Sequence, residues 1–242
     1  TDGEKVGQIN GLTVVSVPGH PISYGEPSRI SCVVHVGDGE LSDVERKVEL
    51  GGDLHAKGML IMQAYILSQL NSHEPLPFTA SMVFEQSYCE VDGDSASLAE
   101  LCAFLSALAI KPIDQSLAIT GSVDQFGMVQ PIGGVNEKIE AFVQLCEKRG
   151  LTGKQGVIIP ETNGINLVLS DEVIRAVEEK QFTIYPISHV DQAVELLTGM
   201  PLQSEEHESI FSLIAQHIED VEHNPSQCSA LFCRIKNWFN QR

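Results

Sequence analysis

A mixed α/β (α+β) fold, in which sheets pack against helices, is predicted by the pattern of apolar residues along the chain. Segments with an apolar residue at every second position alternate with segments that have one at every third or fourth position. One helix, expected to begin near Ser97, is apolar on almost all sides and therefore belongs inside a core. The length of 242 residues and the hydrophobic content of 43% are sufficient for such a core.

The first part of the chain is predicted to be rich in strands. A Pro- and Gly-rich segment from Pro18 to Pro27 separates two β-rich runs, as in an antiparallel pair with a long loop. Asn71 to Pro77, with two prolines, ends the helix that follows. The elements expected here are strands over residues 11–17, 29–36, 44–50 and 78–86, and a helix over 56–70.

The second part of the chain is predicted to alternate strands with helices. Ser97 and Glu100 fit a capping box, Asn136 and Ser170 are good N-caps, and Gly150 ends a helix. The elements expected here are strands over residues 117–123, 128–131, 156–160 and 182–187, and helices from 97 and over 136–149, 171–180, 190–198 and 205–221. We expect one domain over residues 1–200 and an acidic helical C-terminal extension over residues 201–242.

The net charge of −18 argues against a nucleic acid or an anionic membrane as the partner of this chain. The acidic residues are spread over many helix faces, so their simplest role is solubility. No apolar run reaches the ~18 residues of a membrane span, and no signal peptide is recognised. The chain begins with Thr1 rather than Met, and we expect it to be a piece of a longer protein.

The six cysteines have neither C-x-x-C nor zinc-type spacing, and the eight histidines form no H-x-x-x-H pattern. We therefore expect no metal site. Cys102 and Cys146 lie on apolar helix faces, as small core residues do in a reducing compartment, which favours a cytoplasmic location. Cys228 and Cys233 are near enough in sequence to pair under oxidation, although nothing requires it.

A candidate nucleophile, Ser95, follows the acidic turn Asp92-Gly93-Asp94 and precedes the apolar helix. A serine at this place lies among free backbone N–H groups and at the positive end of the helix dipole, where an oxyanion can be stabilised. The alternative is that Asp94, Ser95 and Ser97 only cap the helix. A serine alone does not decide between them, because a nucleophile needs a base.

Lys138 is the candidate base. In the helix from Asn136, it falls at the edge of the apolar stripe, between Leu145 and Phe142, and in the first turn. Burial and the helix N-terminus both favour the neutral amine, and a lowered pKa suits a general base near neutral pH. The alternative is a lysine that extends past Phe142 to water. No histidine lies near either motif in sequence, so a Ser–His–Asp arrangement has no local support.

Several collinear motifs carry a resemblance to a known family. They cover roughly residues 5–200 and include Phe84-Glu85-Gln86-Ser87-Tyr88, Val91 to Glu100 with Gly93-Asp94-Ser95-Ala96-Ser97, Ile119 to Val123, Val129 to Ile139, Arg149 to Gly153 and Gly156 to Pro160. In these motifs the chain resembles the proteolytic domain of the Lon protease family, in the branch whose nucleophile lies in a G-D-S-A-S motif.

This resemblance implies the Lon proteolytic-domain fold, with Ser95 as nucleophile and Lys138 as base. It implies that Thr120 orients the lysine, and that the backbone around Asp94 and Ser95 supplies oxyanion donors. Asp92 stands where the branch often has Glu, and Gly93 lies in the same turn. Gly133 and Gly134 allow the turn that brings Lys138 back to Ser95. If Asp94 pairs with Lys138, the ammonium form is stabilised and the dyad is inactive.

The resemblance also implies a serine-type endopeptidase that cleaves unfolded or damaged proteins inside a homo-oligomeric, hexameric ring. The chain contains no G-x-x-x-x-G-K-[ST] motif, so ATP is implied only for a family ATPase module, expected before Thr1. Residues 201–242 have no counterpart in the resemblance. The alternatives are a non-catalytic ring-forming scaffold or substrate-binding module, and an amidase that acts on small substrates with the same dyad.

Overall fold

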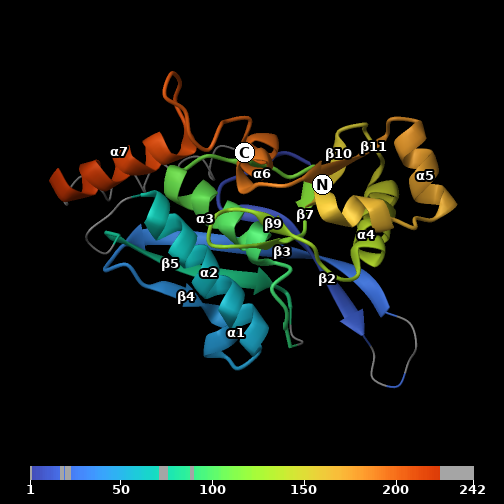
Figure 1. Ribbon diagram of the computed structural model, residues 1–242, viewed down its shortest axis with the longest axis horizontal. Helices are drawn as coiled ribbons and strands as arrows, with labels where there is room; N and C mark the ends of the chain where they lie inside the picture. The colour runs from blue at the N-terminus through green and yellow to red at the C-terminus, as the bar shows by residue number, and fades with distance from the viewer. Residues whose placement is uncertain (1, 17–18, 20–22, 71–75, 88–89, 224–242) are drawn as a thin grey trace.

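The computed structural model describes residues 2–16, 19, 23–70, 76–87 and 90–223 (Figure 1). Within them the strands are β1 (Glu4–Lys5), β2 (Gln8–Ser16), β3 (Ser23–Val36), β4 (Leu41–Asp43), β5 (Phe78–Glu85), β6 (Ile113–Asp114), β7 (Leu117–Ile119), β8 (Ser122–Val123), β9 (Val129–Gln130), β10 (Gln155–Pro160) and β11 (Phe182–Ile187). The helices are α1 (Val44–Lys47), α2 (Asp53–Gln69), α3 (Ser97–Ala109), α4 (Val135–Arg149), the 3-10 helix η1 (Glu161–Asn166), α5 (Asp171–Glu178), α6 (Val190–Thr198) and α7 (Ile210–His223).

A seven-stranded mixed sheet in the order β11-β10-β7-β2-β3-β5-β4 organises the molecule. Strands β2, β3 and β5 are antiparallel neighbours, whereas β2, β7, β10 and β11 run parallel to one another. Two small antiparallel pairs, β1 with β6 and β8 with β9, complete the strands. The mixed α/β fold with packed helices is therefore confirmed.

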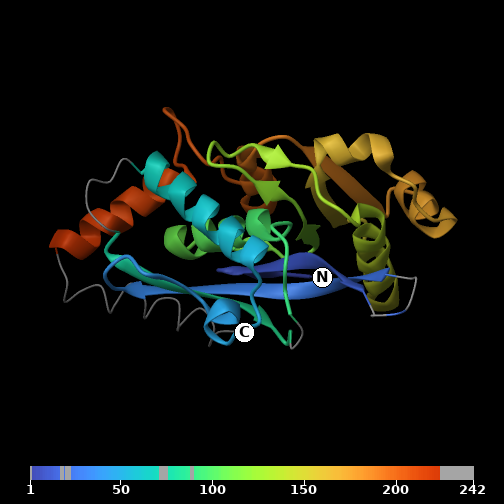
Figure 2. The same ribbon diagram turned by 60° about the horizontal axis from the view of Figure 1, so that its bottom comes forward.

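Two hydrophobic clusters lie on opposite faces of the sheet, because successive strand residues point to opposite sides. Ile119 and Ile158 belong to a cluster with α2, α3, α6 and α7, while Ala118, Val157 and Ile159 belong to a cluster with α4 and α5. Figure 2 shows α2, α3 and α7 on one side of β3 and β5, and α4 at the far end of the sheet. The Ser95 and Lys138 helices thus come from different layers.

The helix expected over residues 205–221 is observed as α7, which begins later, at Ile210. Its apolar face packs on the core: Ile210, Phe211, Ile214 and Val221 are buried in the same cluster as α3. His217 Nδ1 also lies 2.9 Å from the Leu108 carbonyl oxygen of α3. The division of the chain at residue 200 stays a prediction.

Several predictions of local structure are wrong. Residues 44–50, expected as a strand, contain the helical turn α1 instead, because Glu45 turns inward and accepts a hydrogen bond of 2.9 Å from the Phe84 backbone N–H. The Pro- and Gly-rich segment forms less loop than expected, since β3 starts at Ser23. The strand expected over residues 117–123 is divided into β7 and β8 at Thr120 and Gly121.

The side-chain caps are also wrong, although the helices begin close to the expected residues. Ala96, not a serine side chain, is the N-cap of α3, and Ser97 Oγ accepts instead from the Val123 N–H at 3.1 Å. Helix α4 follows Gly134, and Asn136 Oδ1 accepts from the Val168 N–H. Ser170 precedes α5 without a side-chain cap.

Cys102 and Cys146 are buried and free, as expected. Helix α2 ends at Gln69, just before the Asn71 to Pro77 segment that was expected to end it. Residues 71–75 of that segment and the possible pairing of Cys228 with Cys233 lie outside the described residues.

Candidate active site

Ser95 lies in the turn that leads into α3, and several backbone hydrogen bonds hold it there. Its carbonyl oxygen accepts from the Gly121 N–H at 2.9 Å, and the Ser97 N–H donates to the Asp94 carbonyl oxygen at 3.1 Å. Gly93 has φ of 111°, a conformation that side chains with a Cβ rarely adopt, so glycine is required before the turn. Gly121, at the break between β7 and β8, thus supports the turn that carries the candidate nucleophile Ser95.

The backbone N–H groups of Ser95 and Ala96 donate no hydrogen bond to any residue that the structure describes. The neighbouring Ser97 and Leu98 N–H groups are both occupied, the latter by the Gly121 carbonyl oxygen at 3.2 Å. Free N–H groups beside the N-terminus of a buried helix are suited to bind a negative oxygen.

The first helical turn of α4, which lies against the β2–β3 hairpin, places Lys138 beside the turn that carries Ser95. Gly134, the N-cap, has φ of 67° and lies against Val14. Gly25 of β3 lies so close that a Cβ there would be 2.1 Å from the Glu137 carbonyl oxygen. The sequence analysis missed Gly25, because a single glycine in a strand does not indicate which backbone it approaches.

The Lys138 side chain points into the protein and is 2% exposed, so the alternative of a lysine extending to water is wrong. Its Nζ donates to Ser95 Oγ at 2.9 Å and to Thr120 Oγ1 at 3.1 Å. Thr120 is fully buried, and its hydroxyl donates to the Ser95 carbonyl oxygen at 3.3 Å. Serine, threonine and lysine thus form one hydrogen-bonded group at the junction of the two layers.

Burial lowers the pKa of Lys138 to about 8, although the negative charges of Asp94 and Glu137 oppose the shift. Removing an ammonium from water without pairing it with a carboxylate favours the neutral amine. The two hydroxyl groups can bond the amine in either protonation state. Lys138 can therefore accept a proton at a pH only slightly above neutral.

Asp94 is not paired with Lys138 in the described structure. Its Oδ2 accepts from Ser122 Oγ at 3.0 Å, on β8, and its charge acts on Lys138 only from a distance. Asp92 lies further off: its Oδ1 accepts from the Leu54 N–H at 3.1 Å, at the N-terminus of α2. The two carboxylates therefore hold the turn in place, and neither is hydrogen-bonded to Ser95 Oγ or Lys138 Nζ.

Of the two glycines expected to shape the turn before α4, Gly134 has the left-handed backbone conformation and Gly133 does not. A Cβ at Gly133 would meet open space, so nothing in the described structure requires glycine there. Ser122, which holds Asp94, was not singled out in the sequence, because its hydroxyl acts only through the tertiary contact.

No metal site and no membrane helix are found in the part of the chain that the structure describes. There, no group of three or more His, Cys, Asp or Glu side chains is arranged to hold a metal ion. No helix among the same residues is long and apolar enough to cross a membrane.

Comparison with known proteins places this geometry in a family. Residues 82–199, which include Ser95, Thr120 and Lys138, match the model of the Lon protease (S16) C-terminal proteolytic domain. The chain belongs to the Lon proteolytic-domain family. The sequence resemblance and the fold expected from it are therefore confirmed.

Relatives with Lon names cover most of this chain. A Lon protease homolog of Escherichia coli strain K12 is 54% identical over 240 residues, 99% of this chain and 41% of that protein. One of Haemophilus influenzae is 56% identical over 225 residues, 90% of this chain and 37% of that protein. An archaeal Lon protease of Methanocaldococcus jannaschii is 33% identical over 206 residues, 81% of this chain and 28% of that protein. The chain spans less than half the length of each of these relatives.

Proposed function

We propose that this chain is a serine-type endopeptidase that hydrolyses peptide bonds through a Ser95–Lys138 dyad. The observation that carries the proposal is the 2.9 Å hydrogen bond between Lys138 Nζ and Ser95 Oγ in a site where the lysine is buried. A nucleophile and a base within hydrogen-bond reach, with a third group orienting the base, form the minimal unit for acyl transfer.

In the proposed reaction, the neutral Lys138 amine takes the proton of Ser95 Oγ as that oxygen attacks the peptide carbonyl carbon. The carbonyl oxygen becomes an oxyanion, which the free N–H groups of Ser95 and Ala96 are suited to stabilise. The Lys138 ammonium then gives its proton to the departing amine, which leaves an acyl-enzyme. Water, deprotonated by the same amine, releases the acid and restores the serine.

Thr120 is proposed to orient the base. Its hydroxyl accepts from Lys138 Nζ and donates to the Ser95 carbonyl oxygen, so it fixes the amine relative to the nucleophile turn. Both side chains are buried, which limits the rotamers they can adopt. Asp94 and Asp92 are proposed to support the turn through Ser122 and Leu54.

For the whole protein, we propose that the substrates are unfolded or damaged polypeptides and that the domain acts in a homo-oligomeric, hexameric ring. ATP is proposed as the ligand of a separate ATPase module and not of this chain. A cytoplasmic location is proposed from the buried free thiols of Cys32, Cys102 and Cys146, which suit a reducing compartment. Family membership and the names of the relatives support these proposals.

Cleavage of casein and of a fluorogenic peptide by wild type, Ser95→Ala and Lys138→Ala tests the dyad. Both substitutions are expected to abolish turnover, whereas Ser170→Ala and Lys148→Ala, at exposed positions of helix ends, are expected to retain it. A peptide boronate, which bonds covalently to an activated serine, should label Ser95 in wild type and not in Ser95→Ala. Turnover that survives both dyad substitutions would rule the mechanism out.

The alternatives give other outcomes. A scaffold or substrate-binding module would bind unfolded casein without cleaving it and would not react with the boronate. A small-substrate amidase would cleave the fluorogenic amide and leave casein intact. Analytical ultracentrifugation of the same samples tests the hexamer.

A further inference from the structure

Four ionisable side chains that the proposed reaction does not use meet in the core. Asp43 ends β4, Glu45 lies in α1, His55 in the first turn of α2 and Glu100 in the first turn of α3, and none is more than 8% exposed. His55 Nε2 lies 3.1 Å from Asp43 Oδ2 and 3.7 Å from Glu100 Oε1. We call these four residues the His55 cluster.

The geometry of the His55 cluster favours a positive charge on the imidazole. Neither Glu100 oxygen has a hydrogen-bond partner among the described residues, and His55 Nε2 lies within ion-pair distance of both Asp43 and Glu100. A protonated imidazole therefore attracts both acids, and Asp43 also raises the pKa of His55 as a hydrogen-bond acceptor. A neutral imidazole would leave buried carboxylates without a counter-ion, which costs several kcal/mol.

The groups that face His55 come from every element around it. Asp43 comes from β4, Glu45 from α1 and Glu100 from α3, while β5 contributes only the Phe84 ring, edge-on at 5.7 Å. Burial by itself lowers the pKa of His55, but the three carboxylates raise it above its ordinary value. Burial raises the pKa of Glu100 to about 7, so Glu100 becomes an anion only above neutral pH.

The turn that carries Ser95 runs between the two helices that the His55 cluster joins. At its start, Asp92 Oδ1 accepts from the Leu54 N–H of α2 at 3.1 Å, and the Val91 carbonyl oxygen accepts from the Gly52 N–H at 2.9 Å. At its end, the turn continues into α3, where Glu100 is in the first turn. The contact between His55 and Glu100 thus joins the two helices that anchor the turn.

We propose that the His55 imidazolium, held between Asp43 and Glu100, is a positioning residue that fixes the Ser95 turn between the starts of α2 and α3. This inference rests on the proposed function of Ser95. The fold does not need buried charges at this place, because apolar side chains would fill the same space without the cost of burying charge. The positioning role gives a reason for the charged residues.

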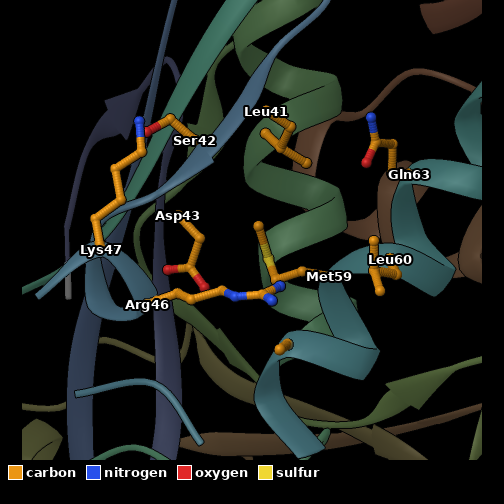
Figure 3. Close-up of a pocket in the computed structure, with 9 residues that line it drawn as sticks. Leu41, Ser42, Asp43, Arg46, Lys47, Met59, Leu60 and Gln63 are labelled. Carbon is orange, nitrogen blue, oxygen red and sulfur yellow. The ribbon is translucent and has the colours of Figure 1, made fainter. Parts of the chain in front are cut away.

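A cavity lies beside the His55 cluster. Asp43 borders a cavity of about 390 Å³ between β4, α1 and α2, shown in Figure 3. Figure 3 also shows the Arg46 side chain extending from α1 towards Met59 of α2, across the cavity. The cavity is lined by Leu41, Ser42, Asp43, Arg46, Lys47, Ala56, Met59, Leu60 and Gln63.

The proposal predicts how the turn responds to pH. The bridge is complete where Glu100 is ionised, above the pKa of about 7 to which burial raises it, and where His55, whose pKa is raised by the acids around it, is still protonated. When the pH rises through the raised pKa of His55, the imidazolium is lost and so is the stabilisation it provides. The turn should then loosen, and turnover should fall on the alkaline side.

Hydrogen exchange measured by mass spectrometry on the full chain tests this without any need for catalysis. Exchange of the imidazole C2 proton gives the pKa of His55, expected above its ordinary value of about 6.5. Amide exchange over residues 91–97, corrected for intrinsic rates, is expected to accelerate as the pH passes that value. In His55→Gln, amide exchange over residues 91–97 should be fast at every pH, by about fivefold or more relative to wild type with a protonated His55.

The matched control is His35→Gln, the same change at an exposed histidine of β3, which should exchange like wild type. If amide exchange over residues 91–97 in His55→Gln equals that of wild type and of His35→Gln at every pH, the proposal is wrong. Should His55→Gln fail to fold, Glu100→Gln replaces it, because this variant keeps the shape and removes the contact to α3. Glu100→Gln with wild-type exchange over residues 91–97 also overturns the proposal.

Turnover adds a second measurement. His55→Gln is expected to lower kcat by about ten- to a hundredfold with little change in KM, and to lack the alkaline fall of wild type. An unchanged kcat and alkaline limb contradict the positioning role. If wild type shows the pH-dependent exchange but cleaves no peptide, the proposed function fails while the link between His55 and the turn stands.

Discussion

Lys138 and His55 are both basic side chains withdrawn from water, but their surroundings move their pKa values in opposite directions. Burial is the largest influence on each and lowers the pKa in both cases. Lys138 meets two hydroxyl groups, so burial prevails and its pKa falls to about 8. His55 meets three carboxylates, which outweigh burial and raise its pKa. The side chains in contact with a buried base, and not the degree of its burial, decide whether it is free to accept a proton.

Lys138→Met should have the largest effect, because it removes the amine and keeps the length of the side chain. Peptidase activity should fall by about a thousandfold or more. The free energy of unfolding should also respond: wild type gains about 3 kcal/mol relative to the variant as the pH rises from 8 to 10.5, since the unfolded chain binds the lysine proton more tightly over that range. Urea unfolding at several pH values measures this, and a difference that stays constant with pH would contradict the lowered pKa.

Gly25→Ala should have the next largest effect, because it acts on the position of Lys138 without changing the dyad. A Cβ at Gly25 would lie 2.1 Å from the Glu137 carbonyl oxygen, so α4 must shift. We expect a loss of about 1–3 kcal/mol in stability and at least about tenfold in kcat. Gly133→Ala is the control, since its Cβ meets open space. Equal effects of the two variants would show that α4 is not positioned by this contact.

Thr120→Val tests whether activity needs the Thr120 hydroxyl group or only a buried side chain of the same shape beside Lys138. The variant keeps the shape of the side chain and removes the acceptor of the 3.1 Å hydrogen bond from Nζ. We expect kcat to fall by about ten- to a hundredfold and the acid limb of the pH profile to move to lower pH, because the ammonium loses a partner. Thr152→Val, in the loop before β10, serves as a control for the substitution itself. A wild-type profile in Thr120→Val would remove the threonine from the mechanism.

Asp94→Asn should have the smallest effect on catalysis. The negative charge of Asp94 raises the pKa of Lys138, so its removal should lower that pKa and move the acid limb of activity downwards by less than about one unit. Asparagine retains an oxygen that can accept from Ser122 Oγ, which keeps the turn in place. The pH dependence of kcat/KM measures the shift. If it does not move, Asp94 does not act on the base.

The pairing of Ser95 with Lys138 was predictable from the sequence, whereas the His55 cluster was not. Ser95 and Lys138 lie in continuous motifs, and the helical period places Lys138 at the edge of the apolar stripe of α4. The members of the His55 cluster are separated by up to 57 positions, from Asp43 to Glu100, and come from four elements. Glu100 was assigned to a capping box and residues 44–50 to a strand, because local patterns cannot show that a charged side chain turns inward.

The sequence by itself therefore determined the fold class, the order of most helices and strands, and the two residues of the proposed dyad. These depend on local periodicity and on short motifs, which a linear chain displays directly. Only the tertiary structure decided which neighbours each buried ionisable group meets: hydroxyl groups around Lys138 and carboxylates around His55. The physical reason is that the charge of a buried group is set by atoms brought together from distant parts of the chain.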